Sequence, residues 1–381
     1  MERKQKKIKI LFTIPNFDTA GSGKALLNIA KRLDKKYFEP HIACLHDKGD
    51  YFKVVLESRI PVHIFQFMVP MEQRIKGLIQ CYKISKQMKN IDPHLIHSFH
   101  YGPDYSEVLS ARMACIPWIF TKKNMSWGGQ SKNGWRMRSY LSSHIIMLNT
   151  TMKKRYYPTL SKTTVIPRGV CLKEFSTNNS KILSCEDFGI PKNSKIVMLV
   201  ANLVPVKGVE HLIEAFSNIS DREKSIYLLI VGDNNNDYGR ELKKNVNKKN
   251  KADKIFFLGK RDDVSNLLQL AYIFILPTID KGRSEGFGVV TLEAMASGVP
   301  VLASDVPGSS DILNDIHDQL FPPEDISILI NKLNWMLKLN DKKRTNLINK
   351  QLKIIRKNFT IEKETEQHSL VYKKLCNLKY E

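Results

Sequence analysis

The sequence predicts an α/β protein with two Rossmann-like, doubly wound domains, each built on a parallel sheet. The chain has 381 residues, and domains average roughly 100–200 residues. Short apolar runs rich in Ile, Val, Leu and Phe alternate with longer segments of helical period in both halves, which is the pattern of βα units. Residues 171–194, between the halves, are polar and rich in turn-forming residues, as linkers are.

The first predicted domain spans residues 1–170. Its apolar runs are short and rich in β-branched side chains, which favours buried strands with helices between most of them. The predicted strands are 7–14, 40–45, 62–67, 94–99, 118–121, 144–148 and 164–167.

The second predicted domain spans residues 195–359 and repeats the alternation. Its predicted strands are 195–203, 226–232, 254–259, 272–277 and 299–305, with helices at 208–219, 238–248, 263–270 and 287–297. After about residue 324 the pattern is helical only, and residues 360–381 have the spacing of one more amphipathic helix. Because open α/β sheets bind ligands beyond the carboxyl ends of their strands, we expect a site in a cleft across which the two domains face each other.

Charge and cysteine content restrict the class of protein. The formal charge is +22, and residues 1–170 contribute +18 of it, from 29 Lys and Arg against 11 Asp and Glu. An anionic partner is therefore expected near the first half. The six cysteines form no C-x-x-C pair, which predicts buried free thiols in a reducing cytosol. No apolar run reaches the length of a membrane span and no secretory signal opens the chain, so a cytoplasmic protein is predicted.

The strongest local signal lies at residues 284–308, SEGFGVVTLEAMASGVPVLASDVPG. Gly286 and Gly288 precede a predicted helix, and the amides of Phe287, Gly288 and Val289 would bind an anion such as a phosphate at the positive end of that helix. Glu285 and Glu293 flank this point, eight residues apart, as acceptors suited to hydroxyl groups. An ordinary capped helix with acidic residues near its start is the alternative interpretation.

Other strand ends of the second domain support a ligand site. Lys207 and Gly208 follow the strand at 195–203, and a lysine there can hold a diphosphate as a point charge. Gly232 ends the next strand, and residues 257–263, FLGKRDD, end the one after it. Together these strand ends predict a rim of nucleotide size.

Nearly the whole chain resembles the retaining glycosyltransferases of GT-B architecture grouped as family 4. The hallmark of that family is two glutamates separated by seven residues, matched here by Glu285 and Glu293 in EGFGVVTLEAMASGVPV. The resemblance implies that Glu285 contacts the donor sugar, that Glu293 binds the ribose hydroxyls and that the amides of Phe287 and Gly288 hold the diphosphate. It implies that Lys207 neutralises the departing diphosphate, and that a final helix at 360–378 crosses back to the first domain.

In the first domain the family has a glycine-rich loop after its first strand. TAGSGKALLNIA, residues 19–30, occupies that place, and Gly21 and Gly23 would let the loop approach donor phosphate or acceptor. A nucleotide-triphosphate P-loop is excluded, because Asp18 and Ala25 stand where that motif needs Gly and Ser or Thr.

The chain also departs from the family pattern. Many members have a histidine after the fifth strand, where this chain has Lys122 and Lys123. Asn202 stands where a basic residue is usual, and Arg168 where an asparagine is frequent; both are retained as candidate donor contacts. His100 is the substitute candidate for a polar group facing the acceptor, with a structural histidine as the alternative.

A metal site is not predicted in either domain. His94, His97 and His100 lie on one strand and its end, but His97 would face the other side of the sheet from His94 and His100. The chain contains no Asp-x-Asp triplet of the kind that holds a metal–diphosphate complex in the other common glycosyltransferase fold. We therefore expect no metal and no cofactor, the donor being a nucleotide-diphosphate sugar.

The resemblance implies a retaining transferase that acts by front-face displacement, in which the leaving diphosphate accepts the proton of the acceptor. The acceptor would be a glycan or a lipid-linked sugar in cell-surface polysaccharide or lipopolysaccharide synthesis, and the resemblance implies that the first domain binds it. Residues 74–89 and 127–141 combine basic with apolar and aromatic side chains, which predicts attachment to an anionic membrane surface on its cytoplasmic face. A sugar-nucleotide epimerase of the same fold is the alternative, and nucleic-acid binding a remote one, because no recognition motif for a specific nucleic acid is present.

Overall fold

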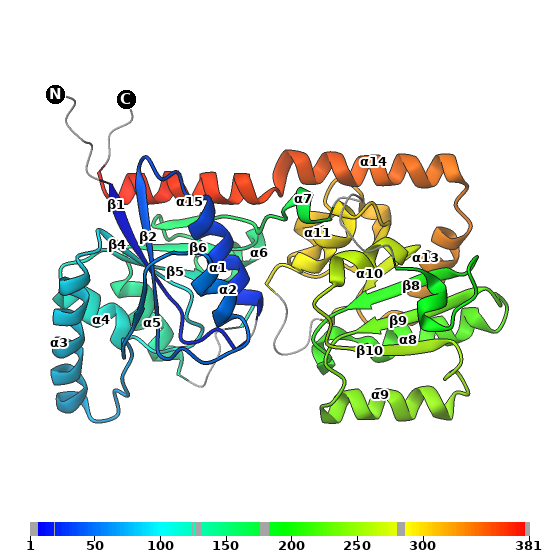
Figure 1. Ribbon diagram of the computed structural model, residues 1–381, viewed down its shortest axis with the longest axis horizontal. Helices are drawn as coiled ribbons and strands as arrows, with labels where there is room; N and C mark the ends of the chain where they lie inside the picture. The colour runs from blue at the N-terminus through cyan, green and yellow to red at the C-terminus, as the bar shows by residue number, and fades with distance from the viewer. Residues whose placement is uncertain are drawn as a thin grey trace. The chain divides into compact units, whose positions relative to one another are not determined.

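The computed structural model describes residues 7–18, 20–123, 125–126, 131–175, 183–279 and 286–377. The chain divides into two compact units, each built around one sheet (Figure 1). The first unit contains the chain up to Arg168 together with the residues from Ile361 onward, and the second contains Gly169–Thr360. The segment 171–194, predicted as a linker, contains helix α7 and the 3₁₀ helix η1 on either side of residues that lie outside the described ones.

The first unit contains a seven-stranded sheet in the order β3-β2-β1-β4-β5-β6-β7. All its strand pairs are parallel. Its strands are β1 Ile8–Thr13, β2 Phe38–Cys44, β3 Val62–Ile64, β4 Leu95–Ser98, β5 Trp118–Lys122, β6 His144–Met147 and β7 Thr163–Val165. Every residue of β4, β5 and β6 is buried, so these strands show no alternation between a core face and a solvent face.

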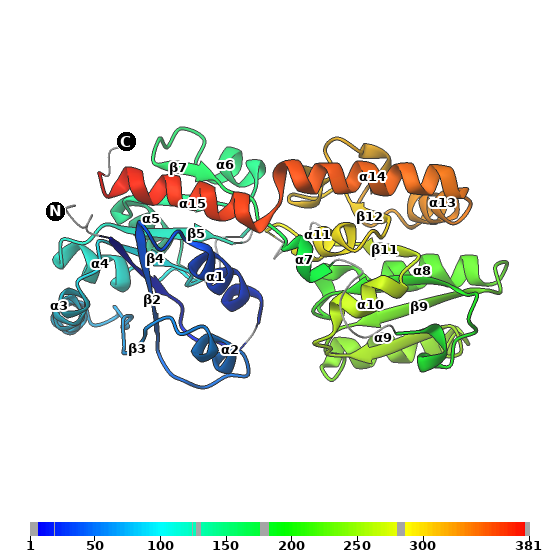
Figure 2. The same ribbon diagram turned by 45° about the horizontal axis from the view of Figure 1, so that its top comes forward.

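Helices cover both faces of this sheet. Helices α3, α4 and α5 pack side by side, and α15 lies against α1, as Figures 1 and 2 show. Since β1–α1–β2 and β4–α4–β5 run outward in opposite directions and both crossovers are right-handed, α1 and α4 lie on opposite faces. The helices are α1 Ala20–Arg32, α2 Phe52–Glu57, α3 Arg74–Ile91, α4 Ser106–Met113, α5 Lys132–Leu141, α6 Thr150–Tyr156 and α15 Ile361–Leu375.

The second unit contains a six-stranded parallel sheet in the order β10-β9-β8-β11-β12-β13. Its strands are β8 Lys195–Val200, β9 Ile226–Val231, β10 Ile255–Gly259, β11 Ile273–Leu276, β12 Val301–Ser304 and β13 Leu320–Phe321. The order reverses between β8 and β11, which makes this the topological switch point where ligands of such sheets bind.

The helices of the second unit follow its strands. They are α7 Leu172–Phe175, η1 Cys185–Phe188, η2 Pro205–Lys207, α8 Val209–Ser220, α9 Asp237–Lys248, α10 Val264–Leu270, α11 Val289–Ala296, α12 Ser309–Ile312, η3 His317–Gln319, α13 Ile326–Leu337 and α14 Asp341–Asn358. Helix α14 packs on α11, which Figure 1 also shows. The α/β class with two parallel sheets is therefore as the sequence predicts.

Most predicted elements are confirmed to within a few residues, and the differences are local. The predicted strand 62–67 ends at Ile64, and the predicted strand 195–203 ends at Val200, where the chain turns into the segment that carries Lys207. Strand β13 was not expected, because two residues carry no periodicity. The predicted helix 360–378 is described as α15, which packs within the first unit.

The prediction that the cysteines are buried free thiols holds only in part. Cys44 and Cys81 are buried, but Cys115 is exposed because it lies at the turn after α4 with a positive φ of 60°. Burial raises the pKa of Cys44 to about 11, so its thiol stays protonated. Among the described helices, none combines the length and the apolar composition that a bilayer span requires.

Candidate active site

The carboxyl ends of β8, β9 and β10 meet closely at one edge of the second sheet. The amide of Ala201 donates to the carbonyl of Val231, and the amide of Gly232 donates to the carbonyl of Gly259. Gly232 has a φ of +155°, and a Cβ there would lie 1.9 Å from the carbonyl oxygen of Ala201. Only glycine fits at this point, so Gly232 allows the two strand ends to come together.

The predicted lysine loop is fastened to the chain that follows β11. Lys207 ends η2 and is half-buried, and Gly208 after it has a φ of +59°. A Cβ on Gly208 would lie 2.2 Å from the carbonyl oxygen of Pro277, and the amide of Ile279 donates to the carbonyl of Val206 at 2.9 Å. The backbone on both sides of Lys207 is thus held next to the strand end that leads to residues 286–289.

The start of α11 has the geometry of an anion site. Gly288, with a φ of +75°, is the N-cap, and having no side chain it provides no capping acceptor for the first-turn amides. A Cβ built on Gly288 would meet only side-chain atoms at 3.4 Å or more. Gly286 and Phe287 are buried and Val289 is half-buried. The amides at this helix start therefore lack a side-chain cap, as an anion site requires.

The loop after β12 packs against the residue that precedes this helix start. Gly308 has a φ of +93°, and a Cβ there would lie 2.6 Å from the Cα of Phe287. The ring of Phe287 packs against Phe359 with centroids 5.8 Å apart. The backbone of Phe287 is therefore fixed on two sides, which orients the peptide that leads to Gly288.

The two predicted glutamates differ in what can be described. Glu293 lies in the second turn of α11 and is half-buried. Glu285 lies outside the described residues. Asn202, the other candidate on this side, is exposed just after β8.

Two hydroxyl groups near the helix start escaped the sequence prediction. The Oγ1 atoms of Thr278 and Thr291 are buried and have no hydrogen-bond partner within the described residues. Thr278 follows β11, and Thr291 lies in the first turn of α11. The sequence signal was their place at a strand end and at a helix start, but threonine is too common at such positions to single them out.

In the first unit, Gly21 and Gly23 do not lie in a loop, contrary to the prediction. Both belong to the first turn of α1. A Cβ on Gly23 would lie 2.8 Å from the ring of Phe17, so this glycine serves the packing of the protein itself, whereas Gly21 faces open space. Of the pair, Gly21 is the one whose surroundings leave room for a ligand.

His100 is half-buried after β4 and is held by Arg138. A guanidinium nitrogen of Arg138 lies 3.1 Å from His100 Nδ1, and the other lies 3.2 Å from the His100 carbonyl oxygen. Burial and the charges of Arg138 and Lys123 lower the pKa of His100 to about 3. His100 is therefore neutral at physiological pH, as a hydrogen-bonding group rather than a charged acid.

Arg168 has a partner that the sequence did not predict. Its guanidinium lies 2.7 Å from Glu364 of α15 in an ion pair that is almost completely buried, and it also stacks over Phe99. The charge of Arg168 is thus compensated within the first unit. The predicted contact of Arg168 with a donor phosphate stays a prediction.

A buried polar network links the same strand ends and was also missed. Glu107 of α4 accepts hydrogen bonds from Thr13 at 2.5 Å and from Ser98 at 2.8 Å. Arg138 donates to Ser98 at 3.4 Å and to the carbonyl of Asp104 at 3.0 Å. These partners are far apart in the sequence, so no local spacing reveals them.

The three histidines have separate partners. His94 Nδ1 accepts from the amide of Lys9 at 3.0 Å. His97 is buried and lies 2.7 Å from the hydroxyl of Tyr372 and 2.8 Å from that of Thr121. Burial lowers the pKa of His97 well below its usual range. Together with His100 on Arg138, each ring is engaged by a different part of the protein.

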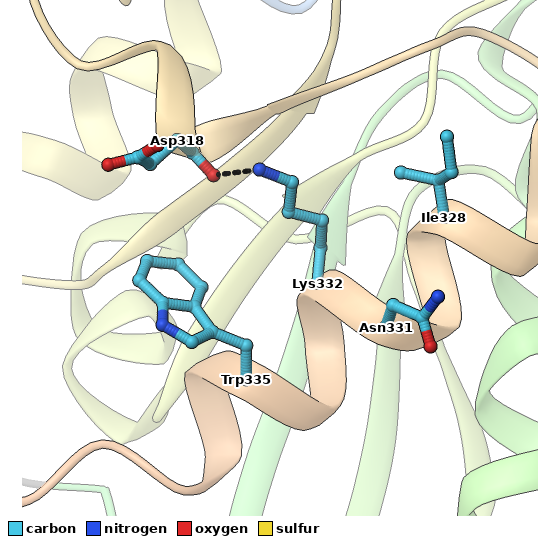
Figure 3. A pocket seen from close by; sticks show the side chains of 5 residues that line it. All are labelled: Asp318, Ile328, Asn331, Lys332 and Trp335. Carbon is cyan, nitrogen blue, oxygen red and sulfur yellow. Dashed lines mark hydrogen bonds between the residues drawn. The ribbon is translucent and has the colours of Figure 1, made fainter.

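Two shallow cavities lie away from these strand ends. The first, of about 400 Å³, is lined by Asp318, Ile328, Asn331, Lys332 and Trp335, and Lys332 Nζ donates to the carbonyl of Asp318 at 2.7 Å (Figure 3). The second adjoins it and shares Trp335. Because η3 directly precedes β13, this region belongs to the amino end of that strand, opposite the carboxyl edge. Neither cavity belongs to the candidate site.

Enzymes that bind phosphorylated nucleotides share three features with this site. These are close backbone contacts that only glycine allows at the switch point of the sheet, a nearby lysine, and a helix start without a side-chain cap. The family described as "Glycosyl transferases group 1" matches residues 182–353, and "Glycosyltransferase Family 4" matches residues 19–174. The chain belongs to this family of glycosyltransferases and has the GT-B fold. It is therefore an enzyme, a glycosyltransferase.

Three similar proteins illustrate the relationship. A UDP-Gal:α-D-GlcNAc-diphosphoundecaprenol α-1,3-galactosyltransferase of Escherichia coli is 26% identical over 296 residues, covering 72% of this chain and 73% of the relative. An O-antigen biosynthesis glycosyltransferase of Escherichia coli is 23% identical, covering 97% and 99%. The crystal structure of Anabaena HepE in complex with UDP and glucose superposes with a TM-score of 0.79 at 22% identity, covering 96% and 100%.

Proposed function

We propose that this glycosyltransferase moves a sugar from a nucleotide-diphosphate sugar to a glycan or lipid-linked acceptor, with retention of anomeric configuration. The observation that carries the proposal is the start of α11, where Gly288 leaves the helix without a side-chain cap and Gly308 supports the preceding peptide. The relatives favour a uridine nucleotide, because one is named for UDP-Gal and the Anabaena structure holds UDP and glucose.

The binding roles follow from position. The amides from Gly286 to Val289 would hold the diphosphate, and Glu293, one to two turns further along α11, would accept from the ribose hydroxyls. Gly232 and Asn202 would border the nucleotide at the ends of β9 and β8. Glu285 would contact the donor sugar.

The chemistry requires charge stabilisation more than a protein nucleophile. As the bond from the sugar to the diphosphate breaks, negative charge grows on the leaving oxygen, and Lys207 and the helix amides would stabilise it. The same leaving oxygen would take the proton of the attacking hydroxyl, which enters from the same face. Preorganised donors of this kind lower the barrier because they need no reorientation in the transition state.

A substitution at Lys207 tests this assignment. Lys207→Ala is expected to lower kcat for sugar transfer from UDP-sugars by about 10²–10³-fold, the usual effect of removing one such donor. Lys248→Ala, an exposed position on α9, is the matched control and should keep full activity. Turnover of Lys207→Ala close to that of the wild type would exclude the proposed role.

We also propose that the reaction needs no divalent metal. The chain has no Asp-x-Asp triplet, and among the described residues no three His, Cys, Asp or Glu side chains gather to hold an ion. Transfer should continue unchanged in EDTA. Activity that EDTA abolishes and Mg²⁺ or Mn²⁺ restores would contradict this.

Helix α3 supports the proposed attachment to an anionic membrane. Ile75, Leu78, Ile79 and Tyr82 are exposed to 78%, 43%, 55% and 55% at helical spacing, although α3 also has a buried face. The helix carries no acidic residue, and its basic residues are Arg74, Lys76, Lys83, Lys86 and Lys89. An exposed apolar stripe flanked by cations fits the interface of an anionic bilayer, where each basic residue contributes about 1 kcal/mol.

Vesicle sedimentation tests this surface. The wild type should bind phosphatidylglycerol vesicles at low salt, and the double variant Ile75→Ser, Ile79→Ser should bind much less. Ile64→Ser, at an exposed apolar residue of β3, is the control and should bind like the wild type. Equal binding of all three proteins would show that α3 is not the contact surface. If the wild type does not bind the vesicles, the proposed membrane attachment is excluded.

A further inference from the structure

A cation without an acidic partner lies at the carboxyl edge of the first sheet. Lys123 follows β5, and its Nζ donates to Ser22 Oγ at 2.9 Å and to the carbonyl of Phe99 at 2.5 Å. Both partners are neutral, and no carboxylate of the described residues lies within ion-pair distance of Lys123. An ammonium group has three N–H donors, and the described protein groups accept hydrogen bonds from two of them. The third N–H is available to a ligand.

The neighbouring cations differ from Lys123 in this respect. Arg168 is paired with Glu364, and the nearby charges of Glu107 and Asp104 act favourably on Arg138. Burial and the charges of Arg168 and Arg138 lower the pKa of Lys123 to about 7. A half-buried cation surrounded by other cations is unfavourable unless an anion joins it.

His100 adds a second donor close enough to Lys123 for the two groups to interact electrostatically. Lys123 holds the carbonyl of Phe99, the residue before His100. Because a guanidinium can only donate, the contact of Arg138 with His100 Nδ1 makes that nitrogen the acceptor and places the imidazole proton on Nε2. Within the described residues, no group accepts a hydrogen bond from Nε2.

We propose that Lys123 and His100 form a binding site for a phosphate group of the substrate at the carboxyl edge of the first sheet, with Arg138 as the positioning residue for His100. Ser22, which holds Lys123, lies in the first turn of α1, a helix of 13 residues with no acidic residue in that turn. The positive helix end adds to the attraction for an anion. The proposal deepens the proposed function, since the phosphate would come either from the donor nucleotide or from a lipid-linked acceptor.

Calorimetric titration with inorganic pyrophosphate tests the site without any turnover. Lys123→Gln should weaken binding about tenfold or more, the usual effect of losing a charge-assisted hydrogen bond. Wild-type affinity should fall as the pH rises from about 6 to about 8.5, because Lys123 loses its proton while Arg138 and Arg168 stay charged and His100 stays neutral. Pyrophosphate gains charge over this range, so its own ionisation cannot produce the fall.

Matched variants separate this site from a general charge effect. Lys123→Arg should bind pyrophosphate without the fall in affinity at higher pH. His100→Gln, whose amide N–H reaches the place of Nε2, should bind like the wild type, whereas His100→Ala should bind more weakly. Unchanged melting temperatures would show that each variant is folded.

The same titrations with UDP identify the source of the phosphate. Weaker binding of both ligands to Lys123→Gln assigns the site to the donor, and weaker binding of pyrophosphate alone assigns it to the acceptor. Either result supports the site. Wild-type affinity of Lys123→Gln for both ligands would overturn it, and because no sugar transfer is measured, that result would leave the proposed function standing.

Discussion

At the scale of single residues, glycines determine how the candidate site of the second unit is built. Gly208, Gly232 and Gly308 each have a positive φ and lie where a Cβ would come within 2.6 Å of the backbone of a neighbouring strand end or, for Gly308, of the start of α11. Side chains at these positions would push apart the loops that carry Lys207 and the start of α11. The site therefore depends on backbone approach as much as on functional groups.

Substitution of Gly308 tests this dependence. Gly308→Ala should cost about 2–4 kcal/mol of unfolding free energy, from the strained φ and the contact with Phe287, and should weaken UDP binding. Gly189→Ala, at a φ of +69° with nothing within 4 Å, should cost about 1–2 kcal/mol and leave UDP binding unchanged. Denaturant unfolding and calorimetry measure the two effects, and equal behaviour of both variants would contradict the argument.

Lys122 is a second residue whose environment makes a prediction. It is 1% exposed, donates to the carbonyl of Ser126 at 2.7 Å and lies over the ring of Tyr156. Burial, with a smaller effect of Arg155, lowers the pKa of Lys122 to about 7. Since an unfolded lysine keeps its proton to about pH 10, the unfolded chain binds more protons than the native one above pH ~7.

The stability of the protein should therefore gain from Lys122 as the pH rises from about 7 to about 9.5. Lys122→Met removes the titrating group and serves as the reference. The melting temperature of the wild type should rise relative to that of Lys122→Met across this window. A difference that stays constant with pH would show that Lys122 does not titrate there.

The sequence could predict only those site residues that local spacing along the chain identifies. Gly288, Glu293 and Lys207 were predicted because each stands at a fixed distance from a strand end or helix start. Arg138 and Lys123 were not assigned, because their roles depend on partners such as Ser22, which is 101 residues from Lys123. Burial of a charged residue cannot be read from its neighbours in the sequence.

At the scale of elements, α15 shows what periodicity leaves out. Its amphipathic spacing predicted a helix, but the buried polar side chains His368 and Glu364 on its packed face were not foreseen. Glu364 binds Arg168, and Tyr372 binds His97 of β4. Polar contacts therefore specify where this helix packs, in addition to its apolar residues.

The ion pair between Arg168 and Glu364 should make α15 sensitive to single substitutions. Glu364→Leu should lower the unfolding free energy by about 3–5 kcal/mol, because it leaves Arg168 buried and uncompensated. The double variant Arg168→Met, Glu364→Leu should recover much of that loss. Urea unfolding checks both, and a double variant less stable than Glu364→Leu would contradict the explanation.

At the scale of the whole molecule, the sequence predicted the two sheets, because alternating strands and helices are a repeated signal. It missed the two-residue strand β13, and it placed Gly21 and Gly23 in a loop rather than in α1. The first error concerns a very short strand and the second the start of a helix, and periodicity is weakest at both.

The most direct test of the proposed function is a crystal structure of the full chain with UDP. We predict that the diphosphate lies within about 3.2 Å of the amides of Gly288 and Val289 and of Lys207 Nζ, with a ribose hydroxyl on Glu293. UDP bound elsewhere, with the start of α11 filled by protein side chains, would contradict the account.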